Sequence, residues 1–287
     1  APMPNKVMKS TLDNGGFILA PGVFDLISAK IADKMDFPAL YITGYGTVAS
    51  YLGLPDAGIA TYRDMVERIS QIIKMTNTPV IADADTGYGG LLNVRETVRG
   101  YEEAGVTAMQ MEDQEFPKRC GHTLGRRVVP MEDMVRKLDV ALDSRKSDNF
   151  LLIARTDSRT SLGLDEAIRR GQAYQKAGAD IIFVESPESE DEMKRVRDEV
   201  DGPLFANMVN GGRTPLLSAH KLTEMGYQIA IHPAVGFLAM GHALTNSYAD
   251  LLQHGETSKG VPLYPFDEFN KLMGFEDIWE FEKKFVD

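Results

Sequence analysis

The stretch Val80-Ile-Ala-Asp-Ala-Asp-Thr-Gly-Tyr-Gly-Gly90 joins a short apolar run to the carboxylates and glycines that end it. The helix-like segment that follows stops at Ala104-Gly105, and a second apolar run extends from Ala108 to Glu112. Glycine ends many helices because it adopts the left-handed backbone conformation without a steric penalty. A strand, a helix and a further strand in this order predict one βαβ unit of a parallel sheet.

The same unit recurs along the chain. Eight short apolar runs each precede a helix-like segment, and they are Phe17 to Leu19, Ala39 to Thr43, Val80 to Asp83, Ala108 to Glu112, Leu151 to Arg155, Ile181 to Glu185, Leu204 to Asn207 and Gln228 to Ile231. Thr61 and Asp64 form a capping-box pattern at the start of one helix-like segment, and Gly178 ends another. Eight units without a linker favour a closed (β/α)8 barrel, a single α/β domain over residues 1–287, over an open doubly wound sheet.

The last part of the chain, residues 234–287, is longer than one barrel helix requires. We expect it to form the last barrel helix and a C-terminal helical extension. Phe275, Trp279 and Phe281 would then be buried, contact another subunit, or cover the base of the barrel.

Composition and charge exclude several classes of protein. The chain has 287 residues, of which 31 are Lys or Arg and 42 are Asp or Glu, and its formal net charge is −11. This balance argues against a nucleic acid or an anionic membrane as partner. A single cysteine, Cys120, excludes an intrachain disulfide and a zinc site of several thiolates, which is typical of a reduced compartment. No apolar stretch approaches the roughly 18 residues that span a bilayer, so we expect a cytoplasmic protein without a membrane partner.

Polar residues end six consecutive strands, from the second to the seventh. In a (β/α)8 barrel the carboxyl ends of the strands carry the chemistry. Asp83, Asp85 and Glu112 would converge there, and buried carboxylates need a cation or protons to neutralise them. Because hard divalent ions prefer oxygen ligands, the sequence predicts a site for Mg²⁺, with Mn²⁺ as the alternative ion. Asp56, in the loop after the second strand, could join this site.

The segment from Pro117 to Arg127, called the cysteine loop below, holds four basic residues, a histidine and the cysteine. Gly121 and Gly125 would let it move, so in an acidic protein it is typical of a lid over an anionic ligand. Neighbouring cations should lower the pKa of the Cys120 thiol and suit it to proton transfer or to nucleophilic attack. The alternative is that Cys120 is buried and acts only as a small hydrophobic residue.

Three other features allow a structural interpretation. Gly44-Tyr-Gly46 follows a strand, but no acidic residue stands where a dinucleotide site needs one, so we expect its amides to surround a substrate carboxylate. Asp113 and Asp157 could simply cap the helices that follow them. The histidines lack the short spacing of zinc ligands, and all except His122 are expected to be structural; the others are His220, His232, His242 and His254.

Several of these motifs resemble the isocitrate lyase and phosphoenolpyruvate mutase superfamily, over essentially the whole chain. They are Gly53-Leu-Pro-Asp56, Asp83-Ala-Asp-Thr-Gly-Tyr-Gly-Gly90, Glu112-Asp-Gln114, Lys118-Arg-Cys-Gly-His122, Ala154-Arg-Thr-Asp157 and Ala206-Asn-Met208. The cysteine loop is similar to that of the carbon–carbon lyase branch, which includes 2-methylisocitrate and 2,3-dimethylmalate lyases, and of its acyl-hydrolase relatives. The resemblance implies a TIM barrel and a homotetramer whose subunits exchange their C-terminal helices.

The resemblance also implies roles for individual residues. The implied metal residues are Asp83, which binds Mg²⁺ directly, Asp85 and Glu112, which hold its waters, and Asp56, which supports the site. The implied substrate-binding residues are Thr43, Gly44, Tyr45, Gly121, Arg155, Asn207 and Pro233. The implied catalytic residues are Cys120 as acid or base, Arg155, Glu185, Lys118 and His122. Our own hypothesis for the base that accepts the hydroxyl proton is Tyr41, because cations nearby would favour its phenolate.

The chemistry implied is Mg²⁺-dependent cleavage of a 2-hydroxy dicarboxylate, such as 2,3-dimethylmalate or 2-methylisocitrate, into a 2-oxo acid such as pyruvate and a carboxylic acid. One alternative is an oxaloacetate acetylhydrolase, although those enzymes carry a serine where this chain has Pro233. Another is a carboxyphosphonoenolpyruvate phosphonomutase, which residues 163–170 and 192–198 resemble. A non-catalytic metabolite-binding barrel would show a damaged site, and none of the named positions is damaged.

Overall fold

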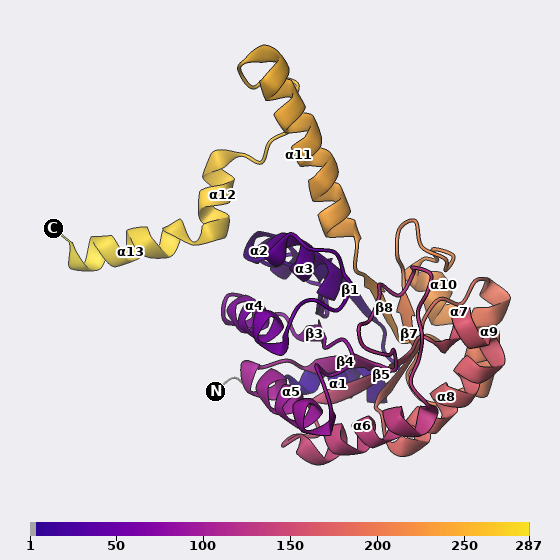
Figure 1. Ribbon diagram of the computed structural model, residues 1–287. Coiled ribbons are helices and arrows are strands. Elements are labelled where there is room, and N and C mark those ends of the chain that lie inside the picture. Colours follow the sequence, from indigo (N-terminus) through magenta and orange to yellow (C-terminus); the bar gives the residue numbers. More distant parts are fainter. Residues whose placement is uncertain (1–3, 287) are drawn as a thin grey trace. The chain divides into compact units, whose positions relative to one another are not determined.

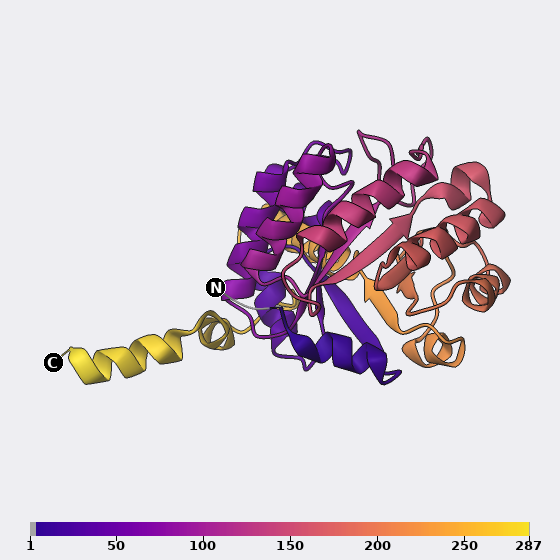
Figure 2. The same ribbon diagram turned by 90° about the horizontal axis from the view of Figure 1, so that it is seen from below.

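The computed structural model describes residues 4–286 and has eight parallel strands, each followed by at least one helix (Figures 1 and 2). The strands are β1 (Ile18–Val23), β2 (Leu40–Ile42), β3 (Val80–Asp83), β4 (Ala108–Glu112), β5 (Leu151–Thr156), β6 (Ile181–Val184), β7 (Phe205–Asn207) and β8 (Ile229–His232). They pair in the order β6-β5-β4-β3-β2-β1-β8-β7. Ile182 of β6 also forms a parallel bridge to Leu204, next to β7, so the two edges meet and the predicted (β/α)8 barrel is confirmed.

Helices follow the strands as predicted, and one helix that precedes β1 was not predicted. They are α1 (Lys6–Asp13), α2 (Leu26–Asp33), α3 (Gly44–Leu52), α4 (Tyr62–Lys74), α5 (Leu91–Ala104), α6 (Met131–Ser144), α7 (Ser158–Leu162), α8 (Leu164–Ala177), α9 (Glu190–Glu199) and α10 (Ala219–Glu224). The capping box of Thr61 and Asp64 is confirmed at the start of α4. Gly105 and Gly178 end α5 and α8 with φ angles of 97° and 109°, which confirms the predicted left-handed stops.

Two apolar layers hold the barrel together. One lies between the strands and the surrounding helices, and Ile42, Ile69 and Val98 belong to it. The other fills the barrel interior with inward-facing strand residues, and Met8 and Leu12 of α1 join it. Helix α1 therefore packs against the interior layer, where it buries these two side chains.

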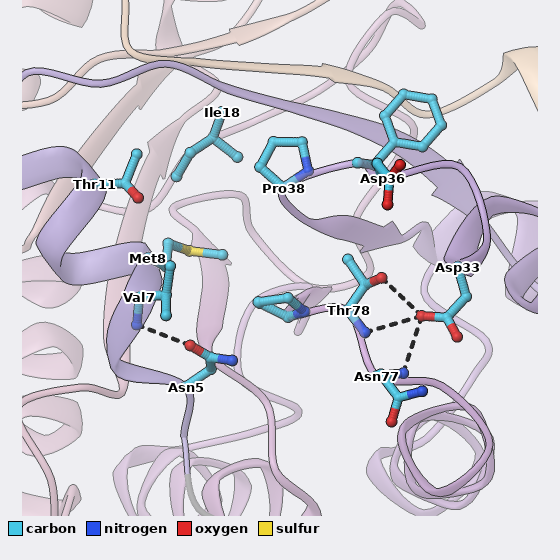
Figure 3. A pocket seen from close by; sticks show the side chains of 12 residues that line it. Asn5, Val7, Met8, Thr11, Ile18, Asp33, Asp36, Pro38, Asn77 and Thr78 are labelled. Atoms are coloured by element: carbon cyan, nitrogen blue, oxygen red, sulfur yellow. Dashed lines mark hydrogen bonds between the residues drawn. The ribbon is translucent and has the colours of Figure 1, made fainter.

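A cavity of about 360 Å³ lies beside α1 (Figure 3). Its lining includes Ile18, Pro38 and Pro79, which stand at or just before the starts of β1, β2 and β3. One carboxylate oxygen of Asp33 accepts hydrogen bonds there from the Thr78 hydroxyl and from the amides of Asn77 and Thr78. The cavity is thus at the amino-terminal end of the strands, opposite the end that carries the chemistry in this fold.

The chain divides into two compact units, Ala1–Gly236 and Phe237–Asp287. Helix α11 (Val235–His254) begins in the first unit, and α12 (Phe266–Met273) and α13 (Phe275–Phe285) complete the second. The extension is therefore helical, as predicted. Phe275, Trp279 and Phe281 are 44%, 46% and 58% exposed, so the second unit by itself does not bury them. None of the helices among residues 4–286 combines the length and apolar character that crossing a bilayer requires.

Gly22 of β1 tests the packing of the barrel wall. A Cβ at this position would lie 2.3 Å from the carbonyl oxygen of Pro233, just after β8. The clash with this backbone atom can be relieved only if the paired strands β1 and β8 move apart. We therefore expect Gly22→Ala to lower the free energy of unfolding by about 2–3 kcal/mol, in the range of overpacked cores. Thermal unfolding should show a melting temperature lower by several degrees. Gly90→Ala is the matched control, since its Cβ would meet only the Asn93 side chain at 4.0 Å; equal melting temperatures for the two variants would contradict the prediction.

Candidate functional site

Alternation along the strands gathers the polar residues at one end of the barrel. Ile81, Ile153 and Phe183 point into the barrel interior, and side chains on one face of a strand recur at every second residue. The same face therefore continues, at the carboxyl ends of the strands, through Thr43, Asp83, Glu112, Arg155, Glu185, Asn207 and Pro233. Seven of the residues implied by the sequence thus share one face at the mouth of the barrel.

Three buried carboxyl groups form a candidate metal site. Asp83 ends β3, Asp85 follows it, and Glu112 ends β4; one ligand atom of each lies within 4.8 Å of the others. Asp85 has a left-handed backbone, with φ 48°, and its amide donates to Asp83 Oδ1 over 2.9 Å. Gly44 lies against this group, because a Cβ there would be 2.5 Å from Asp83 Oδ2. The backbone at these positions thus holds Asp83 and Asp85 together beside the first residue of α3.

The electrostatics of this group favour a cation. Burial raises the pKa of Asp85 to about 7, and it raises that of Glu112 well above its usual range. Gln114 donates to Glu112 Oε2 over 2.7 Å, whereas Glu112 Oε1 is buried and has no hydrogen-bond partner among the described residues. An oxygen-only set with an unpartnered buried carboxylate oxygen fits a hard divalent ion, which takes carboxylate and water ligands. Asp83, Asp85 and Glu112 are the residues that would hold it.

Asp56 lies at the site but is not one of the three carboxyl groups of the candidate metal site. Its Oδ1 is 2.5 Å from Lys118 Nζ, which also lies 3.1 Å from Asp85 Oδ1. Burial disfavours the ammonium, but Asp85 and Asp56 outweigh it, so the pKa of Lys118 is raised well above its usual range. The protonated Lys118 therefore anchors the beginning of the cysteine loop to Asp56 and Asp85.

Arg155 is shared by three carboxylates. It makes two hydrogen bonds to Asp157, and its Nη2 lies 3.2 Å from Glu112 and 3.6 Å from Glu185. Asp157 also receives a hydrogen bond from Arg126, and its side chain makes no bond that caps α7, so the capping interpretation of Asp157 is wrong. Arg155 Nη1 makes no hydrogen bond to the described residues, which leaves one edge of the guanidinium for a ligand.

Asp113 belongs to a separate buried network. Its carboxylate accepts from Tyr174 Oη over 2.7 Å, from Arg170 over 3.1 Å and from the Asp157 amide over 2.8 Å. Asp113 therefore holds two elements in place, the loop after β5 and helix α8. It does not cap α6, so this capping interpretation is also wrong.

Glu185 receives the other end of the cysteine loop. His122 Nε2 lies 3.1 Å from Glu185 Oε1, and Asn207 donates to Glu185 Oε2 over 2.9 Å. Although burial raises the pKa of Glu185, Arg155 and His122 outweigh it and lower that pKa, so Glu185 is ionised. Ser186, with φ 61°, donates from its hydroxyl to the carbonyl of Gly121. A Cβ on Gly121 would lie 2.3 Å from Arg155 Nη2, so only glycine fits in the loop at this point.

The Cys120 thiol differs from the prediction. Burial raises its pKa, and this effect exceeds the lowering influence of the His122 backbone, Arg155 and Lys118. The expected depression of the pKa is wrong because carboxylates already neutralise Lys118 and Arg155. A protonated thiol can donate a proton but is a poor nucleophile.

The hypothesis that Tyr41 acts as a phenolate is also wrong. Tyr41 lies in the interior apolar layer, and its hydroxyl donates to Gln110 Oε1 over 3.1 Å. Burial, followed by the charge of Asp83, raises the pKa of Tyr41 well above its usual range. Tyr41 supports the floor of the site as a neutral hydrogen-bond donor.

Helix α3 begins directly at the mouth. Thr43 caps it through a hydrogen bond from the Gly46 amide, and Gly44 is its first residue. First-turn amides of a helix have no acceptor within the helix, and the helix end favours negative charge. The Thr43 amide itself donates to the Val23 carbonyl, so carboxylate binding at Thr43, Gly44 and Tyr45 stays a prediction.

The structure gives specific contacts to four residues to which the sequence analysis assigned no role of their own. Gln114 bonds to Glu112 and to the backbone of Arg119, and Arg126 bonds to Asp157. Gly212 and Arg213, after β7, contact His122. Gln114 stood inside a motif, but no local signal marked Gly212 or Arg213, because they meet His122 only through the fold.

Comparisons with known proteins identify the family of this chain. The sequence model of the family described as phosphoenolpyruvate phosphomutase matches residues 8–252. The chain is 47% identical over 281 residues to the 2,3-dimethylmalate lyase of Eubacterium barkeri, with 97% of each protein covered.

Two solved structures are similar to this one. A crystal structure of 2,3-dimethylmalate lyase, described as a PEP mutase/isocitrate lyase superfamily member, has a TM-score of 0.91 at 36% identity and covers 99% of this chain and 96% of that one. The structure of oxaloacetate acetylhydrolase with the inhibitor 3,3-difluorooxalacetate has a TM-score of 0.91 at 34% identity, over 96% and 95% of the two chains. The chain therefore belongs to the isocitrate lyase/phosphoenolpyruvate mutase superfamily and is an enzyme of its carbon–carbon lyase class.

Proposed function

We propose that this enzyme is a Mg²⁺-dependent lyase that cleaves a 2-hydroxy dicarboxylate into a 2-oxo acid such as pyruvate and a carboxylic acid. Substrates of this class are 2,3-dimethylmalate, 2-methylisocitrate and similarly substituted malates, and Mn²⁺ is the alternative ion. The observation that carries the proposal is the group of three buried carboxyls beside a loop whose cysteine is protonated. The close relative that is a 2,3-dimethylmalate lyase supports the choice within the family.

The residues of the chain divide the work of binding. The first turn of α3 at Gly44 receives one substrate carboxylate, next to Asp83. Arg155 and His122 face the part of the site where the second product forms, and Glu185 and Asn207 hold that side in place. Bound at Asp83, Asp85 and Glu112, the metal ion would polarise the oxygens of the 2-oxo-acid half as a Lewis acid.

Cleavage requires one proton to leave and one to arrive. The substrate hydroxyl gives its proton to a water molecule as it becomes the oxo group, the adjacent C–C bond breaks, and the electron pair of that bond forms the enediolate of the departing carboxylic acid. Arg155 and the loop cation Lys118 stabilise the enediolate electrostatically. The Cys120 thiol then donates its proton to the enediolate carbon, which completes the carboxylic acid and leaves a thiolate to be reprotonated.

Two further functions stay open to experiment. The structural similarity to oxaloacetate acetylhydrolase keeps acyl hydrolysis as the second candidate, and Pro233, in place of a serine after β8, favours the lyase. A phosphonomutase is the third. A regulator that only binds metabolites would not need a protonated cysteine beside three buried carboxyl groups.

We also propose a cytoplasmic homotetramer with exchanged C-terminal helices. The extension carries large exposed apolar side chains that a partner would cover; Leu252, Phe266, Phe281 and Phe285 are among them. A small molecule would be the substrate, and neither nucleic acid nor membrane would be a partner of a chain with net charge −11.

The first test of the proposed function is a substrate panel. Substituted 2-hydroxy dicarboxylates, oxaloacetate and phosphonopyruvate would be incubated with enzyme and Mg²⁺, and 2-oxo acid, oxalate and phosphate release measured. We expect release of a 2-oxo acid from at least one substituted malate, because the cysteine loop and the three buried carboxyl groups suit carbon–carbon cleavage. Oxalate from oxaloacetate, or phosphonate turnover, without any lyase activity would overturn the choice.

The metal requirement is tested by chelation. EDTA should abolish turnover and excess Mg²⁺ should restore it, because three buried carboxyl groups hold the ion. Glu112→Gln should weaken Mg²⁺ binding in calorimetry, while Glu115→Gln, an exposed neighbour, should leave it unchanged. Full activity in EDTA would contradict a metal-dependent mechanism.

The third test concerns Cys120. Cys120→Ser should lower kcat by about 10²- to 10⁴-fold, the contribution of a positioned proton donor, with a smaller change in KM. Since burial raises the thiol pKa, the donor stays protonated at mildly alkaline pH, so the alkaline fall of wild-type kcat should begin above the usual range of a thiol. Leu124→Ala is the control, because Leu124 is in the same loop and 72% exposed. Equal loss in both variants would mean that the loop is merely disturbed.

A further inference from the structure

The cysteine loop is attached to the barrel on both sides of Cys120. Two residues before it, Lys118 lies between Asp56 and Asp85. Two residues after it, His122 is buried, with only 8% of its side chain exposed, beside Glu185. The thiol therefore stands midway between two fixed points, and its position depends on both of them.

The second attachment uses a segment far away in the sequence. The backbone amide of Arg213, in the loop between β7 and α10, donates to His122 Nδ1 over 3.0 Å, across 91 residues. A ring nitrogen that accepts a hydrogen bond carries no proton, so Nδ1 of His122 carries none and Nε2 is the ring nitrogen that can. That nitrogen lies 3.1 Å from the ionised Glu185. His122 Nε2 is buried and makes no hydrogen bond to the described residues, so the hydrogen bond that fixes the ring is the one from the Arg213 amide.

Gly212 provides the space that this contact needs. A Cβ on Gly212 would lie 2.6 Å from His122 Nδ1 and 3.0 Å from its Cε1. Gly212 is not among the glycines with positive φ, so the requirement is for room and not for a special backbone conformation. At the neighbouring Gly211 the requirement is for backbone conformation instead, because its φ is 77° and an added Cβ would meet no atom within 4 Å. Any side chain at position 212 would displace the imidazole ring.

We propose that Gly212 and the backbone amide of Arg213 are positioning residues that hold the cysteine loop closed by receiving His122. They act through His122 and touch no reacting atom themselves. The contact fixes the end of the loop that Lys118 does not fix, and so sets the position of the Cys120 thiol between the two attachments. This inference rests on the proposed function, because it holds that the contact positions Cys120 for proton donation.

The kinetic test is a double-mutant cycle of Gly212→Ala and His122→Ala. Gly212→Ala should lower kcat by about 10- to 100-fold, the usual effect of losing an outer contact that orients a functional group, and it should change KM less. In the His122→Ala background the same substitution should have little further effect, because the ring that the methyl group displaces is gone. Asn210→Ala, an exposed neighbour in the same loop, is the control and should behave like the wild type.

Hydrogen exchange measures the contact without any substrate. In His122→Ala, the peptide that contains the Arg213 amide should exchange faster, because this amide loses its acceptor. In Gly212→Ala, the peptide over residues 118–124 should exchange faster as the loop is released. The exchange in His122→Ala keeps the proposal testable even if Gly212→Ala does not fold.

The outcomes separate the two proposals. Equal kcat losses from Gly212→Ala in both backgrounds, or unchanged exchange in the loop and at Arg213, would overturn the role of Gly212 and Arg213. The expected exchange pattern in a protein that turns over none of the candidate acids would retain the contact between Arg213 and His122 but refute the proposed function.

Discussion

The balance of buried charge at the mouth of the barrel governs the rest of the site. Six carboxyl groups and three permanent cations meet there; the carboxyls are Asp56, Asp83, Asp85, Glu112, Asp157 and Glu185, and the cations are Lys118, Arg126 and Arg155. Ionised groups are costly to bury unless each is paired. The excess of carboxyls is concentrated at Asp85 and Glu112, whose pKa values are raised. This excess of buried carboxyl groups is the feature that lets Asp83, Asp85 and Glu112 form a candidate metal site.

This charge balance also explains the form of the cysteine loop. Of its four basic residues, Lys118 and Arg126 are buried against carboxylates, and Arg119 and Arg127 are exposed. The loop is thus held closed by ion pairs whose partners belong to the candidate metal site and to the Arg155 network. Because these cations are already neutralised, burial decides the protonation of Cys120, and the thiol is suited to donate a proton.

Much of the fold and of the site could be predicted from the sequence, for a local reason. Side chains alternate along a strand, so the inward positions of each strand continue into the residue that ends it, as Ile81 does into Asp83 and Ile153 into Arg155. Parallel strands in a barrel bring these ends together, and the identity of the last residue then gives the chemistry. The two predictions of pKa failed, for Tyr41 and Cys120, because both assumed that neighbouring cations act in full and that burial is minor.

The sequence by itself therefore determined the eight strands, the glycine stops of α5 and α8, and the acidic and basic residues that gather at the mouth. These depend on periodicity and on residue type, which are local properties. The tertiary structure alone decided the depth of each group, the three carboxylates that share Arg155, and the contact of Gly212 and Arg213 with His122. Desolvation and Coulomb energy depend on distances in space, and residues that are 91 positions apart acquire such a distance only when the barrel closes.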